Sequence, residues 1–159
     1  MGNRAVITTN KNLEETGIYI HWNGGRDSVE AFLAYCDLRG YRKPEEDCYG
    51  WAALVTVINN FTGCFSCGVD RACWLDTDNY DNGTYIIKDW RIVGRKFKRG
   101  GEQYYHGFRE MITAIDVRQP KDLRLTEGQW ERLEEVYKDV KKYRKHTNRD
   151  EHGRFVKEE

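Results

Sequence analysis

The chain has 159 residues, and its 26 Lys and Arg residues are balanced by 26 Asp and Glu residues, so its formal net charge is zero. A chain of this length fits one domain with a real hydrophobic core. The charge balance excludes a global attraction to nucleic acid or to an anionic membrane surface, and the longest apolar run, within residues 51–58, is far shorter than the roughly 20 residues that cross a bilayer.

Residues 4–9 (RAVITT) and 17–22 (GIYIHW) alternate between apolar and polar side chains and are rich in β-branched residues, which predicts a β-hairpin. A helix follows, with apolar residues at helical spacing from Val29 to Leu38. We expect Asp27 or Ser28 to cap its start and Gly40 to end it.

Residues 44–47 (PEED) favour the start of a second helix, over residues 48–61. This helix is apolar on most sides, which is typical of a central position in a fold. Strand-rich segments follow at residues 64–75 and 84–97, and Asn82-Gly83 between them is the strongest hairpin signal in the chain.

Residues 102–115 are compatible with a third helix, and Thr126-Glu127 starts the clearest helix of all. We therefore predict an α+β fold with a mainly antiparallel sheet covered by helices on one face and a long C-terminal helix. Residues 1–120 would form the core, residues 121–147 the C-terminal helix packed on it or extending from it, and residues 148–159 a mobile polar tail.

The five cysteines are an odd number without an export signal, which indicates free thiols in a cytoplasmic protein. Cys48, at a predicted helix start, is a candidate nucleophile with His21 as its base. The segment Asp47-Cys48-Tyr49-Gly50-Trp51 resembles the Asp-Cys-Ser-Gly segment of NlpC/P60 thiol peptidases, which implies a papain-like hydrolase. The alternative is that Cys48 is a small buried hydrophobic residue.

Two motifs suggest metal sites. Cys64 and Cys67 have zinc-knuckle spacing, and Cys73 and Cys48 could complete a thiolate set, although buried free thiols explain the same residues. The loop with Asp76, Asp78, Tyr80 and Asp81 only partly matches a calcium-binding loop, and a hairpin turn explains it without an ion. We therefore expect neither a metal nor a cofactor, and interpret this loop as an acidic, aromatic surface patch.

The strand-to-helix corner combines His21, Trp22, Asn23, Arg26 and Asp27 around two glycines. A helix N-terminus beside Gly24-Gly25 could bind an anion, and the side chains offer stacking, hydrogen bonding and charge. A nucleotide and a protein carboxylate both fit this chemistry. The corner is thus a second candidate recognition surface.

Four segments resemble a group of short accessory proteins of phages and mobile elements of low-GC bacteria: GNRAVITT, GIYIHWNGGRDSVEAFLAYC, the stretch from Asp47 to Trp51, and LDTDNYDNGTYIIKDWRIVGR. The resemblance implies an anti-defence context, which includes anti-CRISPR proteins and sponges for signalling nucleotides. The expected function is a non-enzymatic protein that inhibits a bacterial defence protein or nuclease complex by occupying its surface. The alternatives are a thiol hydrolase using Cys48 and His21, and a nucleotide-binding sponge using Trp22, Asn23 and Arg26.

Overall fold

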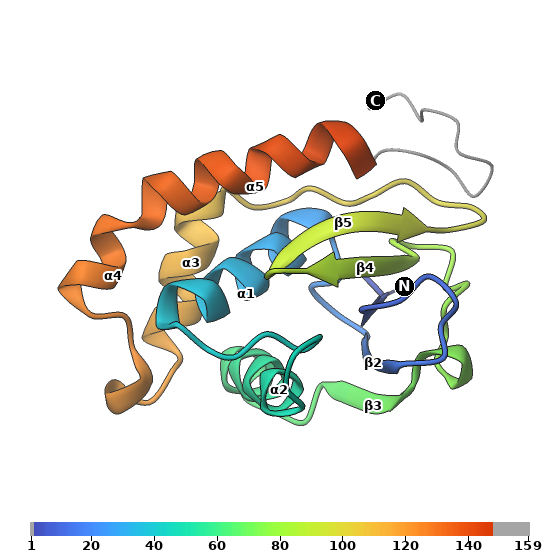
Figure 1. Ribbon diagram of the computed structural model, residues 1–159, viewed down its shortest axis with the longest axis horizontal. Coiled ribbons are helices and arrows are strands. Elements are labelled where there is room, and N and C mark those ends of the chain that lie inside the picture. Colours follow the sequence, from blue (N-terminus) through green and yellow to red (C-terminus); the bar gives the residue numbers. More distant parts are fainter. Residues whose placement is uncertain (1, 148–159) are drawn as a thin grey trace.

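A computed structural model describes the backbone of residues 2–147 and the side chains of residues 2–144. Its strands are β1 (Ala5–Thr8), β2 (Thr16–Ile20), β3 (Cys67–Arg71), β4 (Thr84–Lys88) and β5 (Arg91–Lys96). They form one sheet in the order β3-β2-β1-β4-β5, in which only the β1–β4 pair is parallel (Figure 1).

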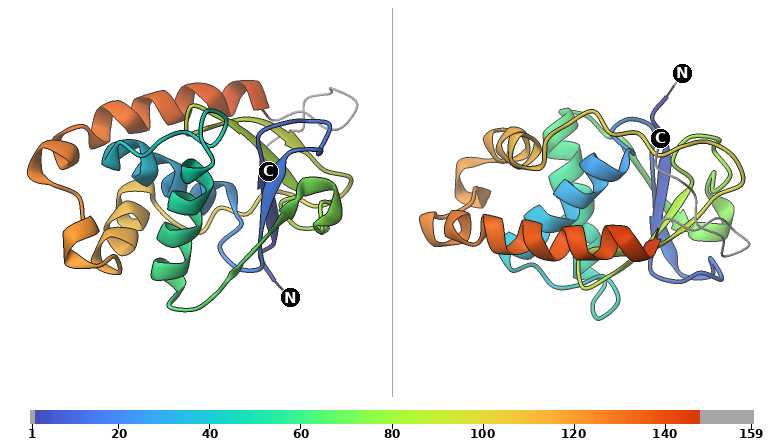
Figure 2. Two further views of the ribbon diagram at one scale, coloured as in Figure 1. Left: turned by 60° about the horizontal axis from the view of Figure 1, so that its bottom comes forward. Right: turned by 90° about the horizontal axis from the view of Figure 1, so that it is seen from above.

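The helices are α1 (Arg26–Arg39), α2 (Tyr49–Thr62), α3 (Phe108–Val117), α4 (Glu127–Glu131) and α5 (Leu133–Thr147), with short 3-10 turns η1 (Ala72–Trp74) and η2 (Lys121–Leu123). Two further views show the helices gathered on one side of the sheet (Figure 2). The predicted α+β fold with a mainly antiparallel sheet is therefore confirmed.

The central helix is α1, and the prediction that residues 48–61 form the central helix is wrong. Helix α1 packs against α2, α3, α5 and β5, and nearly all its side chains are buried, among them Phe32 and Leu33. Helix α2 buries only one side, through residues such as Leu54 and Ile58. Its other apolar side chains stay at least partly exposed, so its high apolar content overstated its burial; they are Tyr49, Ala52, Ala53, Val55 and Phe61.

The predicted N-terminal hairpin is confirmed, since β1 and β2 pair antiparallel from Ala5 opposite Ile20 to Thr8 opposite Gly17. The hairpin predicted at Asn82-Gly83 is wrong. The chain crosses from the edge strand β3 to β4, which pairs with β1 and β5. Asn82 is buried and donates a hydrogen bond from its amide to the Arg4 carbonyl, so this polar pair closes a crossover and not a hairpin.

The tight turn lies instead between β4 and β5, at Asp89 and Trp90, whose φ angles of 53° and 59° are both positive. Such angles are unfavourable for a bulky residue. Burial compensates, because the Trp90 side chain is 1% exposed and its Nε1–H donates to the Tyr41 carbonyl. A turn held by tertiary contacts leaves no signal in the local sequence.

Helix α3 begins at Phe108, later than predicted, because residues 97–107 have no regular secondary structure. We call residues 97–107 the strap. The predicted start at Thr126 is confirmed by a capping box between Thr126 and Gln129. Leu133, Val136 and Val140 of α5 belong to the main core, so the C-terminal helix packs on the core, while residues 148–159 lie outside the described part.

Candidate functional site

The corner between β2 and α1 divides into an exposed half and a buried half. His21 is exposed and Trp22 is 54% exposed, whereas Arg26 and Asp27 are 1% and 5% exposed. Asn23 lies between them with a φ of 60°, a left-handed conformation that asparagine tolerates better than most residues. The five residues therefore do not form one recognition surface.

In the buried half, the strap covers the N-terminus of α1. The Asp27 carboxylate accepts hydrogen bonds from the backbone N–H groups of Tyr105 (2.5 Å) and His106 (2.6 Å). A Cβ atom on Gly25 would lie 2.5 Å from the Gln103 carbonyl oxygen, which shows how closely the strap approaches. In the described part of the chain, the anion cradle considered for this helix end is not open, because the Asp27 carboxylate and the backbone of the strap cover it.

The predicted cap is corrected as well. Helix α1 starts after Gly25, and within the described residues no side chain caps it. The Ser28 hydroxyl is buried and makes no hydrogen bond there, while Asp27 accepts from the Ser28 N–H. Asp27 thus ties the strap to the helix, a tertiary role that the local sequence did not indicate.

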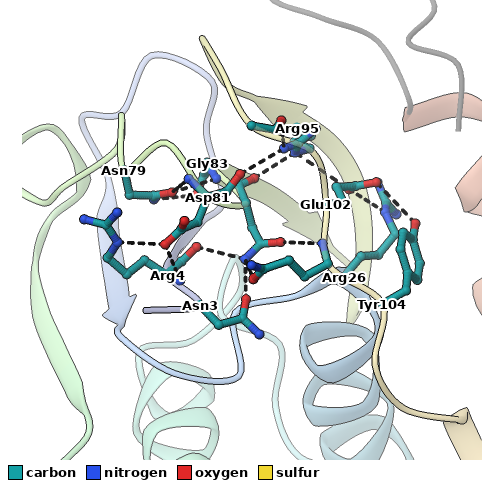
Figure 3. Close-up of polar contacts among 12 residues, drawn as sticks. Asn3, Arg4, Arg26, Asn79, Asp81, Gly83, Arg95, Glu102 and Tyr104 are labelled. Carbon is teal, nitrogen blue, oxygen red and sulfur yellow. Dashed lines mark hydrogen bonds and ion pairs between the residues drawn. The ribbon is translucent and has the colours of Figure 1, made fainter. Parts of the chain in front are cut away.

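Arg26 lies in a buried polar cluster on Glu102 of the strap (Figure 3). Its Nε is 2.7 Å from Glu102 Oε1, and Arg95 Nε is 3.8 Å from the same oxygen. The Tyr104 hydroxyl donates to Glu102 Oε2, and the Arg26 guanidinium lies 5.6 Å from the Tyr85 ring centroid. These contacts engage Arg26 inside the molecule, so it cannot serve a ligand at the surface.

The same cluster shifts the acid–base properties of its members. Burial raises the pKa of Tyr85 well above its ordinary value, and Glu102 raises it further. Burial lowers the pKa of Arg95, although Tyr85 and Glu102 act in the opposite direction. Both shifts follow from desolvation, which penalises the charged form. The cluster fastens the strap to α1 and the sheet.

The exposed half of the corner opens into a surface depression with a volume of about 730 Å³, which we call the groove. Three parts of the chain line it: the turn between β2 and α1, the C-terminal end of α2 with the segment after it, and the residue after α3. The lining residues are Trp22, Asn23, Asn60, Phe61, Thr62, Gly63, Cys64, Ser66 and Arg118.

The groove combines stacking, hydrogen-bonding and cationic groups. Trp22 presents an exposed indole, which His21 contacts edge-on with ring centroids 5.0 Å apart. His21 Nδ1 is 3.0 Å from the Tyr19 hydroxyl, which fixes the imidazole. The Arg118 guanidinium lies 4.6 Å from the Phe61 ring centroid on the other wall. This is the chemistry of a recognition surface, in which aromatic and arginine side chains act as anchors.

Sequence reasoning identified Trp22 and Asn23 but missed the residues of the other wall. Asn60 and Arg118 are 58 positions apart in the chain and meet only because α2 packs against α3. The one local hint was the polar pair Asn59-Asn60 near the end of an apolar helix. Such a pair is common at helix ends and carries little information alone.

The proposed thiol dyad is not assembled. Cys48 is the residue before α2 and is exposed, which also corrects the alternative that it is buried. His21 is next to Trp22, which lines the groove at the opposite end of α2. A helix of 14 residues is about 21 Å long at 1.5 Å per residue. Cys48 and His21 are therefore too far apart to exchange a proton.

The cysteines do not form a metal site either. Cys64 and Cys73 are exposed, Cys67 is half-buried and burial raises the pKa of its thiol to about 11. Among the described side chains, those of residues 2–144, no group of three or more His, Cys, Asp or Glu residues is placed to hold a metal ion. The zinc and calcium arrangements considered from the sequence are thus not formed.

The acidic loop is largely neutralised by its own neighbours. Asp81 pairs with Arg4 at 2.7 Å, Asp76 lies 3.7 Å from the same guanidinium, and Asp78 pairs with Lys98 at 3.1 Å. Tyr80 is 63% exposed. The expected negative patch is therefore a mixed-charge surface with one prominent aromatic side chain.

Protein-family models, curated protein sequences and solved structures were compared with the chain, and none of them matches it. In the described part of the chain, every helix is too short or too polar to span a bilayer. The function must therefore be inferred from the residues and their geometry.

Proposed function

We propose that this chain is a binding protein of a phage or mobile element that inhibits a bacterial defence protein in the host cytoplasm by occupying its surface. The main support for the proposal is the groove, whose lining combines an exposed tryptophan, Arg118 and hydrogen-bonding side chains. Tryptophan and arginine are among the residue types that contribute most to protein–protein binding. The resemblance to phage accessory proteins supports the anti-defence context.

A protein partner fits the groove better than a nucleotide does. Arg118 is the one charged side chain among the described lining residues, and Arg26, the other cation considered for phosphate binding, is buried against Glu102. Phosphate groups are usually bound by several cations or by free backbone N–H groups. Among its described lining residues the groove has one cation, and the groove lies at the C-terminal end of α2, where a helix exposes carbonyl groups and a negative dipole end, which disfavours the nucleotide sponge.

The thiol hydrolase is also disfavoured, because Cys48 and His21 lie at opposite ends of α2. The acidic loop remains a second candidate face for a nuclease complex, through Asp76, Asp78, Tyr80 and Asp81. Its paired charges favour it less than the groove, since carboxylates already matched by Arg4 and Lys98 have less to gain from a basic partner.

The test is a plaque assay in bacteria that carry a defence system, such as a CRISPR nuclease, and express the chain. The wild-type chain should restore plaque formation by a targeted phage. Trp22→Ala and Arg118→Glu should abolish this protection, because loss of an anchor residue weakens binding about 30-fold or more.

Tyr49→Ala is the matched control, since Tyr49 is also an exposed aromatic residue and lies at the other end of α2. It should protect the phage as well as the wild type does. Full protection by both groove variants would refute the groove as the recognition face. Loss of protection in Asp78→Lys and Tyr80→Ala alone would assign the function to the acidic loop.

A further inference from the structure

Strand β3 is an open sheet edge. Within the described residues it pairs only with β2, and its residues from Gly68 to Arg71 are exposed. Natural edge strands are usually blunted by Pro, by Lys and other charged side chains, by a bulge or by a covering segment. Strand β3 (CGVDR) has neither Pro nor Lys, and its register with β2 is continuous. Its two charged residues, Asp70 and Arg71, have opposite signs, so a second copy can pair with it without placing like charges opposite each other. The strand is therefore a template for a further strand.

The hydrogen-bonding groups that face outward can be assigned from the ladder. The Ala72 N–H donates to the Glu15 carbonyl, so alternation in an antiparallel pair directs the backbone groups of Gly68 and Asp70 towards β2. Those of Cys67, Val69 and Arg71 then point away from the sheet. Asp70 Oδ1 already accepts from the Arg71 N–H at 2.7 Å. Cys67 and Val69 can therefore each offer an N–H and a carbonyl group to a further strand, and Arg71 can offer its carbonyl group.

We propose that two copies of this chain pair their β3 strands antiparallel, about a two-fold axis at Val69. In this register Val69 stands opposite Val69 of the second copy, Cys67 opposite Arg71, and Gly68 opposite Asp70. No like charges are directly opposed, whereas an axis at Asp70 would place two carboxylates opposite each other. Two Val69–Val69 hydrogen bonds form, and each Cys67 N–H reaches the Arg71 carbonyl of the other copy.

The exposed aromatic residues at the two ends of β3 favour a second copy as the occupant. Phe65, four residues before Val69, is 99% exposed, and Trp74, five residues after it, is 71% exposed. Phe65 and Trp74 lie just outside opposite ends of β3, so antiparallel pairing about Val69 brings the Phe65 end of one copy to the Trp74 end of the other. Each copy therefore brings an aromatic side chain to both exposed ends of the other strand.

Charge does not oppose this association. The formal net charge of the chain is zero, so two copies do not repel each other at long range. The proposal does not rest on the proposed function: no residue of β3 lines the groove, although Cys64 and Ser66, on either side of Phe65, do. A dimer would carry two grooves.

Sedimentation velocity tests the pairing, with the full chain at about 1 to 200 µM, since dimer formation depends on concentration. We expect a dimer for the wild type and, for Val69→Lys, a dissociation constant raised at least about tenfold, because lysine at a sheet edge blocks pairing. Val69 is 55% exposed, so the fold should survive, which circular dichroism checks. Tyr49→Lys, which adds the same charge away from β3, should dimerise like the wild type.

Crosslinking tests the register. In a background with Cys48, Cys64 and Cys73 changed to Ser, Val69→Cys should oxidise to a disulfide joining the two positions 69, because directly opposed hydrogen-bonded residues have Cα atoms about 5.5 Å apart. Asp70→Cys is the control and should not crosslink, since the two positions 70 would be roughly 8 Å apart.

The proposal is overturned if the wild type stays monomeric or if the Val69→Lys variant dimerises normally. A crosslink from position 69 to Cys67 of the second copy also overturns it, because that crosslink would place the two-fold axis at Gly68. A monomer that still protects phages in the plaque assay would refute the dimer and leave the proposed function standing.

Discussion

Glu30 provides a sharp test of the buried polar interior. It lies on α1, is 3% exposed, and its carboxylate accepts hydrogen bonds from Arg144 Nε at 2.9 and 3.2 Å. Arg26 also attracts it, while Glu102 repels it. Burial outweighs these attractions and raises the pKa of Glu30 from 4.5 to about 7. We therefore predict that ionised Glu30 destabilises the fold and that Glu30→Gln relieves this.

The sign follows from proton binding. Between pH 4.5 and about 7 the folded protein keeps a proton on Glu30 that the unfolded chain has lost. Stability therefore falls as pH rises through this window, and the loss is complete above it. At about 1.4 kcal/mol for each tenfold change in proton affinity, the loss is about 3 kcal/mol. Gln cannot ionise, so the variant should gain about 3 kcal/mol on the wild type between pH 4.5 and pH 8.

Urea denaturation followed by tryptophan fluorescence at several pH values measures this difference. The two stabilities should be similar near pH 4.5 and diverge towards pH 8. Glu46→Gln controls for the loss of one negative charge, because Glu46 is exposed. Parallel pH profiles for the wild type and Glu30→Gln would show that Arg144 and Arg26 fully compensate the burial of the charge, and would refute the reasoning.

Two further predictions concern the backbone at Gly83 and the thiol of Cys48. Gly63→Ala should cost roughly 1–2 kcal/mol of left-handed backbone strain, because Gly63 has a φ of 74° and a Cβ there would have no atom within 4 Å. Gly83→Ala should destabilise the protein well beyond this. Gly83 has a similar φ of 76°, but its Cβ would lie 2.6 Å from the Lys96 carbonyl oxygen. Equal urea midpoints for the two variants would contradict this. Iodoacetamide should label exposed Cys48 at the same rate in the wild type and in His21→Ala, as measured by mass spectrometry. A rate that falls tenfold or more would reinstate the thiol hydrolase.

Local patterns predicted those elements whose structure depends on neighbouring residues. The period-two alternation of residues 4–9 and 17–22 predicted the hairpin, Gly40 marked the end of α1, and Thr126 marked the start of α4. In each case the deciding interaction is a side-chain period, a left-handed glycine or a cap within a few residues. The site was only half predictable for the same reason, since Trp22 and Asn23 are neighbours in sequence whereas Arg118 is not.

By itself, the sequence determined the fold class, the N-terminal hairpin and the ends of several helices. Only the tertiary structure decided that polar α1 is central while apolar α2 is peripheral, because the buried side chains of Arg26 and Glu30 find ion-pair partners in Glu102 and Arg144, far along the chain. It also decided that β4 pairs with β1, which turned Asn82-Gly83 from a hairpin into a crossover. Contacts between residues distant in sequence leave no local pattern, and they determine which of the candidate side chains face a partner.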